Sequence, residues 1–168
     1  MTPRLTHIAL HLRDLQASID FYRDICGMTI VHEREDGGKR VVWMAEAGRE
    51  NDFVFVLVPG GPGRDQADKD ISHFGFALDS RAAVDRVAGV AGREGYLVWP
   101  PRQEPWPVGY YCAVKDPDGN LIEFSYGQPL GPGASDLDNE GPGRDAGDMT
   151  VKPLDADAAG TGSEGRAS

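Results

Sequence analysis

The alternation of apolar and polar residues in the first half of the chain predicts a strand, a helix and then three strands. The predicted strands cover residues 5–12, 28–33, 39–44 and 53–58. Asp14 can cap the helix, which extends to about Ile25 and stops at Gly27. An Asp-Gly-Gly turn at 36–38 joins two of the strands into a hairpin.

The second half of the chain repeats this order. Its predicted strands cover residues 72–78, 96–99, 110–114 and 120–126. Ser80 can cap the intervening helix, which ends at Gly95. The last two strands are joined by Asp116-Pro117-Asp118-Gly119, with Pro and Gly at the second and fourth places of a type I turn. The proline-rich segment 99–107 is expected to be a loop, either a lid or a rigid connector.

The two halves overlay in register, which indicates an internal duplication. The segment around His7 lies over the segment around His73, so that the two histidines occupy equivalent positions. In the closing strands of the two halves, Val56 falls where Glu123 stands. A pseudo-twofold arrangement would place these four positions around one axis. Three of the four carry a side chain that can bind a metal.

Two imidazoles and one carboxylate suit a divalent transition metal that keeps open coordination positions. Any one of these residues alone would more often be a hydrogen-bonded histidine or a solvated strand residue. Their symmetry-related placement favours a shared metal. Glu123 also lies between Ile122 and Phe124, where a carboxylate is costly to bury without a cation or a donor. We therefore expect His7, His73 and Glu123 to be the metal ligands.

The chain resembles the vicinal-oxygen-chelate superfamily, which includes glyoxalase I, fosfomycin-resistance proteins, extradiol dioxygenases and bleomycin-binding proteins. The resemblance covers about residues 4–127 and rests on motifs in the order and spacing of that fold: His7-Ile8-Ala9-Leu10, Asp14-Leu15, Ser18-Ile19-Asp20-Phe21-Tyr22, Gly27, Ser72-His73-Phe74-Gly75-Phe76 and Asp116 to Glu123. It implies an α+β fold of two βαβββ modules, at about 4–58 and 71–127, that form paired troughs. It also implies a homodimer, in which different subunits often contribute the two halves of a site.

The resemblance narrows the expected chemistry. Glyoxalase I normally has a carboxylate at the position of Val56, and some glyoxalases have an arginine at the position of His11, so a standard lactoylglutathione lyase is disfavoured. Two histidines and one carboxylate match the facial triad of non-haem Fe(II) in the extradiol dioxygenases. Those enzymes usually carry a tyrosine at the position of Ala113 and a separate acid/base histidine. Tyr111 and His11 are the candidate catalytic proton donors in this chain.

The sequence thus predicts a divalent-metal-dependent enzyme with dioxygenase-type chemistry on an aromatic or other vicinal-oxygen small molecule. Fe(II) is the favoured ion, and Mn, Ni and Zn are alternatives. A metal-dependent lyase or isomerase and a non-catalytic protein that binds an aromatic drug stay open as functions. A fosfomycin-type transferase ranks third. Such enzymes rely on basic residues around a phosphonate, and no Lys or Arg follows Glu123 before Arg144. Seven aromatic residues lie in the strands and the proline-rich segment, of which some must be core and others would suit a flat ligand: Trp43, Phe53, Phe55, Trp99, Trp106, Tyr110 and Tyr111.

Composition limits the partners and the compartment. The net charge of −10 argues against nucleic acid as a partner, because such binding needs a basic surface. Neither a signal peptide nor a membrane span is recognisable, and the two cysteines lie far apart, so we expect a reduced, cytoplasmic protein without a membrane partner. Residues 1–128 are expected to form the domain. Residues 129–168, rich in Gly, Asp and Ala, are expected to be a disordered acidic tail.

Overall fold

The computed structural model describes residues 2–64, 66–67, 69–132 and 134. The first module contains β1 (His7–Leu12), α1 (Leu15–Asp24), β2 (Met28–Asp36), β3 (Lys39–Glu46) and β4 (Val54–Pro59). The second contains β5 (His73–Ala77), α2 (Arg81–Glu94), β6 (Leu97–Glu104), β7 (Gly109–Lys115) and β8 (Leu121–Tyr126). The predicted order of two βαβββ modules is therefore confirmed.

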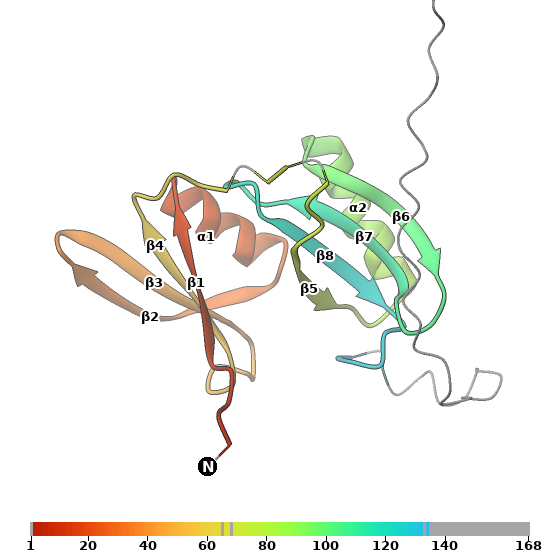
Figure 1. Cartoon of the computed structure of the whole chain (residues 1–168), viewed down its shortest axis with the longest axis horizontal. Coiled ribbons are helices and arrows are strands. Elements are labelled where there is room, and N and C mark those ends of the chain that lie inside the picture. The colour runs from red at the N-terminus through yellow and green to blue at the C-terminus, as the bar shows by residue number, and fades with distance from the viewer. Residues whose placement is uncertain (1, 65, 68, 133, 135–168) are drawn as a thin grey trace, which may run out of the picture.

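Each module forms one four-stranded sheet, and the two sheets have the same topology. The strand orders are β1-β4-β3-β2 and β5-β8-β7-β6. In both sheets the first strand of the module runs parallel to its last strand, and the remaining pairs are antiparallel. Figure 1 shows the two curved sheets as separate lobes, with α2 on one face of the second sheet. This repeated topology confirms the duplication that the sequence indicates.

Local capping sets the ends of both helices. The carboxylate of Asp14 accepts a hydrogen bond from the backbone N–H of Ala17, and the hydroxyl of Ser80 accepts one from Ala83. Gly95 ends α2 in the left-handed conformation, at φ 81°. The helix starts predicted from the sequence are confirmed, because the capping side chains needed no tertiary contact to act.

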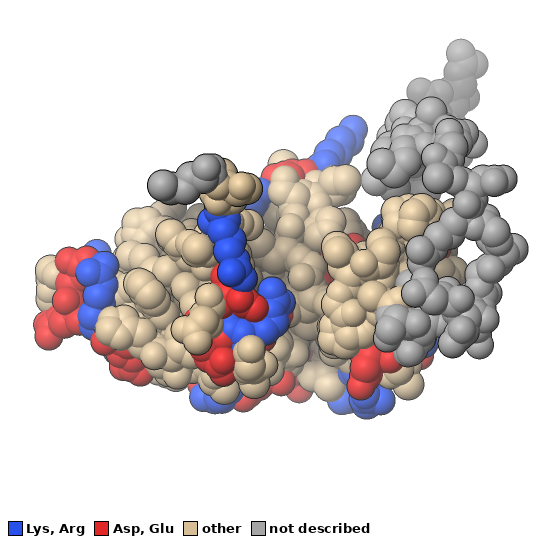
Figure 2. All heavy atoms as spheres, turned by 90° about the horizontal axis from the view of Figure 1, so that it is seen from below, with Lys and Arg blue, Asp and Glu red and all other residues tan. Residues whose placement is uncertain are grey.

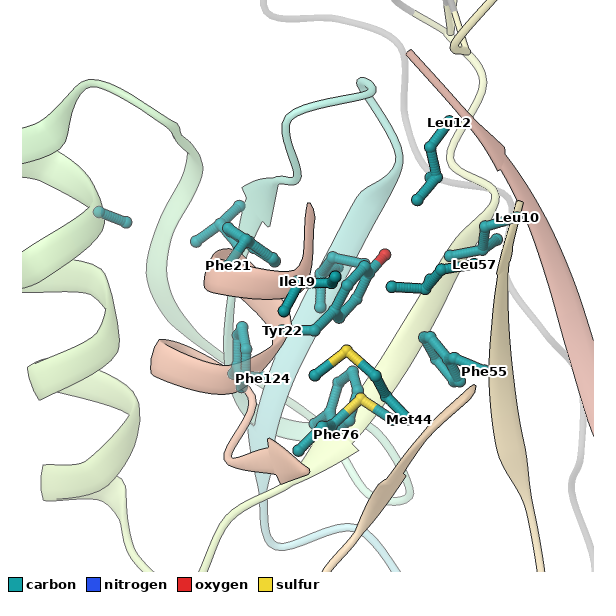
Figure 3. Packing of buried hydrophobic residues seen from close by; sticks show 14 of the residues in the cluster. Leu10, Leu12, Ile19, Phe21, Tyr22, Met44, Phe55, Leu57, Phe76 and Phe124 are labelled. Atoms are coloured by element: carbon teal, nitrogen blue, oxygen red, sulfur yellow. The ribbon is translucent and has the colours of Figure 1, made fainter. Parts of the chain in front are cut away.

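Helix α1 lies between the two modules and joins their cores. Its Tyr22 side chain is fully buried and meets Phe55 of β4 edge to face, while Phe21 meets Tyr96 beside the second sheet. Figure 3 shows Tyr22 among side chains of both modules. One continuous apolar cluster includes Leu10 from the first module and Phe124 from the second. Burial of these aromatic side chains, each worth a few kcal/mol, holds the modules together within one chain.

The turn between β7 and β8 adds polar contacts to this junction. The backbone N–H of Gly119 donates to the carbonyl of Asp116 over 3.0 Å, as the predicted type I turn requires. Asp118 is 1% exposed, and its carboxylate accepts hydrogen bonds from the backbone N–H of Arg13 and the hydroxyl of Ser18. A buried carboxylate with two donors is satisfied, and it fixes the start of α1 against the second module.

Residues 99–104 of the proline-rich segment are strand and not loop, which corrects the prediction for them, while residues 105–108 form a turn. Strand β6 continues through Pro100 and Pro101 to Glu104, at the edge of its sheet, where a residue without an N–H can be accommodated. Trp99 pairs with Ala113 and the next recorded pair is Arg102 with Tyr111, so β6 bulges by one residue between them. The sequence alternation could not show this bulge, because prolines normally signal a break.

The described surface carries mixed charge. On the face shown in Figure 2, the Lys and Arg side chains lie in small groups beside Asp and Glu, without a continuous basic band. No helix in the described ranges is long and apolar enough to cross a membrane. Most of the tail predicted from residue 129 lies outside the described residues.

Candidate metal centre

The sheet registers confirm that Val56 and Glu123 occupy equivalent places in the two modules, as do His7 and His73. Val56 pairs with Ala9, two residues after His7, and Glu123 pairs with Gly75, two residues after His73. Both histidines lie on the exposed side of their first strands, opposite the buried Leu10 and Phe76. The trough face of each sheet is the face that carries its histidine. The candidate ligands are thus all trough residues, and Val56 leaves the fourth position without a donor atom.

His73 and Glu123 come together on the second trough. The Nε2 atom of His73 lies 3.6 Å from Oε2 of Glu123. The Nδ1 atom of His73 is 2.7 Å from the carbonyl oxygen of Ile71, and a carbonyl can only accept, so this nitrogen carries the proton. In the neutral ring Nε2 then has a free lone pair on the side of the carboxylate. This is the arrangement of a metal-binding histidine whose other nitrogen is tied to the backbone.

Glu123 is buried with few donors. Glu123 is 6% exposed, and its Oε1 atom accepts a 2.9 Å hydrogen bond from Nε2 of Gln128. No other hydrogen bond to this carboxylate is present among the residues that the structure describes. Two atoms that ligate one ion at about 2.1 Å each lie at most about 4.2 Å apart, so the separation from His73 suits a shared cation. The donor set fits a divalent metal.

His7 stands apart from that pair within one chain. It lines a hollow of about 410 Å³ on the first trough, together with Trp43, Phe53 and Val56. Its Nδ1 atom lies 3.1 Å from the hydroxyl of Thr6. In the described part of the chain, no three His, Cys, Asp or Glu side chains are close enough to share an ion. The three predicted ligands therefore do not meet in a single described chain.

The candidate catalytic residues lie in different places. His11 lines a second hollow, of about 280 Å³, with Gly63, Arg64 and Phe74. The connecting segment packs on its ring, since a side chain at Gly61 would approach Cγ of His11 to 2.6 Å. Tyr111 faces the second trough, where it lies next to the pair formed by Ala113 and Glu123. Of the two predicted proton donors, Tyr111 is the one near His73 and Glu123.

Tyr111 belongs to a cluster that the sequence does not reveal. Its hydroxyl accepts a 2.5 Å hydrogen bond from Nε of Arg102, and its ring meets that of Trp99. Trp99 in turn meets the His73 ring at 6.3 Å between centroids. Burial raises the pKa of Tyr111, and the neighbouring guanidinium partly offsets the rise. The sequence ranks the fosfomycin-type transferase low because no Lys or Arg closely follows Glu123. Arg102 precedes Glu123 in the sequence, and only the β6 bulge turns its side chain toward the trough.

The aromatic residues predicted to line a ligand site lie on different faces of the two sheets. Phe55 is 5% exposed in the core, and Tyr110 contacts Asp85 of α2 on the other face of the second sheet. Trp106 is 60% exposed. Trp43, Trp99 and Tyr111 are therefore the trough aromatics of the predicted set. Phe53 borders the hollow beside His7 but also packs its ring against Phe55 of the core. The ring nitrogen of Trp43 is buried and has no hydrogen-bond partner in the described residues.

Residues 4–124 match the Glyoxalase/Bleomycin resistance protein/Dioxygenase superfamily. The chain belongs to this superfamily. An uncharacterised protein of Pseudomonas aeruginosa is 59% identical over 137 residues, which are 82% of this chain and 98% of that protein. A probable trivalent organoarsenical cleaving enzyme of Bacillus subtilis is 27% identical over 73% of this chain and 80% of its own length. The superfamily relatives thus align across both modules.

Solved structures of the superfamily share the fold. A possible glyoxalase from Bacillus cereus has a TM-score of 0.55 at 25% identity, covering 72% of this chain and 96% of its own. A mutant fosfomycin resistance protein from Listeria monocytogenes, complexed with Mn(II) and 1S,2S-dihydroxypropylphosphonic acid, has a TM-score of 0.61 at 20% identity. That likeness covers 77% of this chain and 94% of the Listeria protein. The Listeria protein and this chain therefore share the same fold.

Proposed function

We propose that this protein is a divalent-metal-dependent enzyme that carries out dioxygenase-type chemistry on an aromatic or other vicinal-oxygen small molecule. The observation that carries the proposal is the 3.6 Å approach of His73 Nε2 to Glu123 Oε2, with Nδ1 of the histidine tied to the Ile71 carbonyl. A buried carboxylate facing the free nitrogen of an imidazole is costly without a cation between them. Family membership supports this class of function.

The third ligand in this proposal is His7 of the partner subunit in a homodimer. A single described chain brings only His73 and Glu123 together, and His7 lies on the trough of the other module. Pairing the first module of one chain with the second module of another would complete the set without changing either sheet. The partner's hollow, lined by Trp43 and Phe53, would then cover the ligand pair and provide apolar walls.

Fe(II) is the ion that we propose for this site, because two histidines and one carboxylate form its facial triad. When bound, it supplies Lewis acidity and redox chemistry. The chain's own contribution is binding, orientation and proton transfer. Trp99 and Trp43 offer flat surfaces to a planar substrate. Burial raises the pKa of the Tyr111 phenol, its oxygen accepts from Arg102, and its O–H has no acceptor among the described residues, so it can donate to a substrate oxygen.

Elemental analysis of protein purified without added metal tests this proposal. Stoichiometric iron, followed by oxygen uptake with a panel of catechols, supports the dioxygenase. Bound nickel, zinc or manganese without oxygen uptake would overturn the dioxygenase in favour of Lewis-acid chemistry. Absence of metal, even after loading with Fe(II) under nitrogen, would overturn the enzyme altogether and favour a protein that sequesters an aromatic compound.

A metal-dependent lyase or isomerase is the second candidate function. A probable lactoylglutathione lyase of Synechocystis is 25% identical over 71% of this chain and 92% of its own length. The same metal ligands would serve this function, with Tyr111 as the proton-transfer group. Val56 weighs against the glyoxalase reaction itself, since its side chain has no atom that can ligate or move a proton. Assay of hemithioacetal turnover beside the oxygen-uptake assay separates the two functions.

A further inference from the structure

Arg102 is a partly exposed cation with unused donors in the second trough. Its guanidinium lies 5.4 Å from the centre of the Trp99 ring and 4.9 Å from that of Tyr111. Its Nε donates to Tyr111, and its nearest carboxylate partner is Glu104, at 4.0 Å. Within the described residues, neither terminal nitrogen of Arg102 makes a hydrogen bond. Two rings and one hydroxyl therefore orient the group, while its outer edge stays available.

The bulge in β6 is what turns Arg102 to this face. Trp99 and Arg102 are three residues apart, and in a regular strand such residues point to opposite sides of the sheet. The extra residue at Pro100 and Pro101 changes the alternation, so both side chains contact Tyr111. The prolines have no N–H to donate to the neighbouring strand, so the irregular pairing at this edge leaves no proline donor unsatisfied. The local backbone thus presents a cation to the trough.

This cation lies beside the candidate metal ligands. Trp99 contacts both Arg102 and the ring of His73, and Tyr111 is next to the pair of Ala113 and Glu123 on the same face. No ion pair joins Arg102 to Glu123 among the described residues. Arg102 is therefore linked to His73 through the Trp99 ring, on the face of the sheet that carries Glu123.

We infer that Arg102 binds an oxyanion group of the substrate, a carboxylate or a phosphonate, and so orients it at the His73 and Glu123 pair. The inference rests on the proposed function for the substrate's position, but the anion contact needs no metal. A guanidinium edge with two free nitrogens matches two oxygens of such a group with paired hydrogen bonds. A cation held in the trough also favours acidic small molecules over neutral ones.

Titration of metal-free protein with methylphosphonate and with acetate tests the inference. The full chain is kept in EDTA at constant ionic strength, and the indole N–H resonance of Trp99, assigned with Trp99→Phe, reports binding by NMR. We expect saturable shifts in the wild-type protein with at least one of the two anions, and an apparent Kd raised at least about tenfold in Arg102→Gln. Arg102→Lys keeps the positive charge but lacks the paired N–H donors of the guanidinium, so its apparent Kd should lie between those of the wild type and Arg102→Gln.

Arg81 provides a matched control. Its guanidinium also stacks on a tyrosine, at 4.0 Å from the Tyr110 ring, but on the helix-covered face of the same sheet. Arg81→Gln should bind both anions as the wild type does. Equal losses in the two glutamine variants, or unchanged binding in Arg102→Gln, would overturn the inference. Mn(II) binding, measured separately, distinguishes its failure from failure of the metal site, because only the latter abolishes metal uptake.

Discussion

The hydroxyl of Tyr22, on α1, donates a 2.7 Å hydrogen bond to Asp116, in the turn between β7 and β8. The first helix of the chain is thereby fixed to the last hairpin, across 94 residues of sequence. Asp116 also accepts hydrogen bonds from the backbone N–H groups of Asp118 and Asn120 and from the Asn120 side chain. The turn that presents β8, and with it Glu123, is therefore built around one carboxylate.

Tyr22→Phe should lower the free energy of unfolding by about 1.5–3 kcal/mol, because it removes a hydrogen bond to a buried charged group. The ring and its packing against Phe55 are retained, so the loss reports the hydroxyl alone. Urea denaturation measures it. Tyr110→Phe is the control, since that hydroxyl donates over 2.7 Å to Asp85 at an exposed site, where water can replace the contact, so its loss should lower the free energy of unfolding by less than in Tyr22→Phe. Equal losses in both variants would contradict a special role for the buried contact.

Stability should decline in mild alkali, partly through Cys112. Burial raises the pKa of this thiol from 9.0 to about 11, so its stabilising contribution is complete below pH 9 and is lost as the pH rises through 11. The thiolate forms first in the unfolded chain, which it stabilises. We expect the urea midpoint to fall across this range, and to fall less steeply in Cys112→Ala. Comparing slopes with pH separates this effect from the cavity that alanine leaves. Parallel slopes in the two proteins would rule out the thiol as a contributor.

The sequence predicts the elements of this fold well because each half carries its own caps and turns. Asp14 and Ser80 cap helices through local hydrogen bonds, and the duplicated order makes an error in one half visible in the other. The alignment of Val56 with Glu123 depends only on this repetition, and the strand registers confirm it.

The sequence predicts the surroundings of the candidate site less well. Alternation assigns faces correctly only in strands without bulges, and β6 shifts register between Trp99 and Arg102. The donor from Gln128 to Glu123 comes from a residue beyond the last strand, where no periodicity exists. The separation of His7 from His73 depends on how two modules pack, which no local pattern encodes.

Gln128→Leu should weaken Mn(II) binding by about 10- to 100-fold, because the amide that orients one oxygen of Glu123 is removed. The ligands themselves are unchanged, and isothermal titration of metal into metal-free protein gives the affinity. Gln16→Leu is the matched control: its amide donates to Asp20 on the exposed face of α1, so metal affinity should stay at the wild-type value. An unchanged Mn(II) affinity in Gln128→Leu would argue that Glu123 does not bind the metal in the orientation that Gln128 holds.

A metal site shared between subunits predicts that two inactive variants restore each other. His7→Ala and Glu123→Gln should each abolish high-affinity Mn(II) binding as homodimers. In a heterodimer of the two, one site loses both ligands while the other combines His7 of one subunit with His73 and Glu123 of the other.

Random exchange makes half of the dimers mixed, and each mixed dimer has one intact site of two. Unfolding and refolding the variants together should therefore recover about a quarter of the wild-type binding capacity. Each variant refolded alone is the control and should recover none. If the mixture also recovers none while size-exclusion chromatography with differently tagged chains shows mixed dimers, the ligands do not meet across a subunit boundary. Recovery at the wild-type affinity would instead assign His7 to the opposite chain, because a site within one chain gains nothing from exchange.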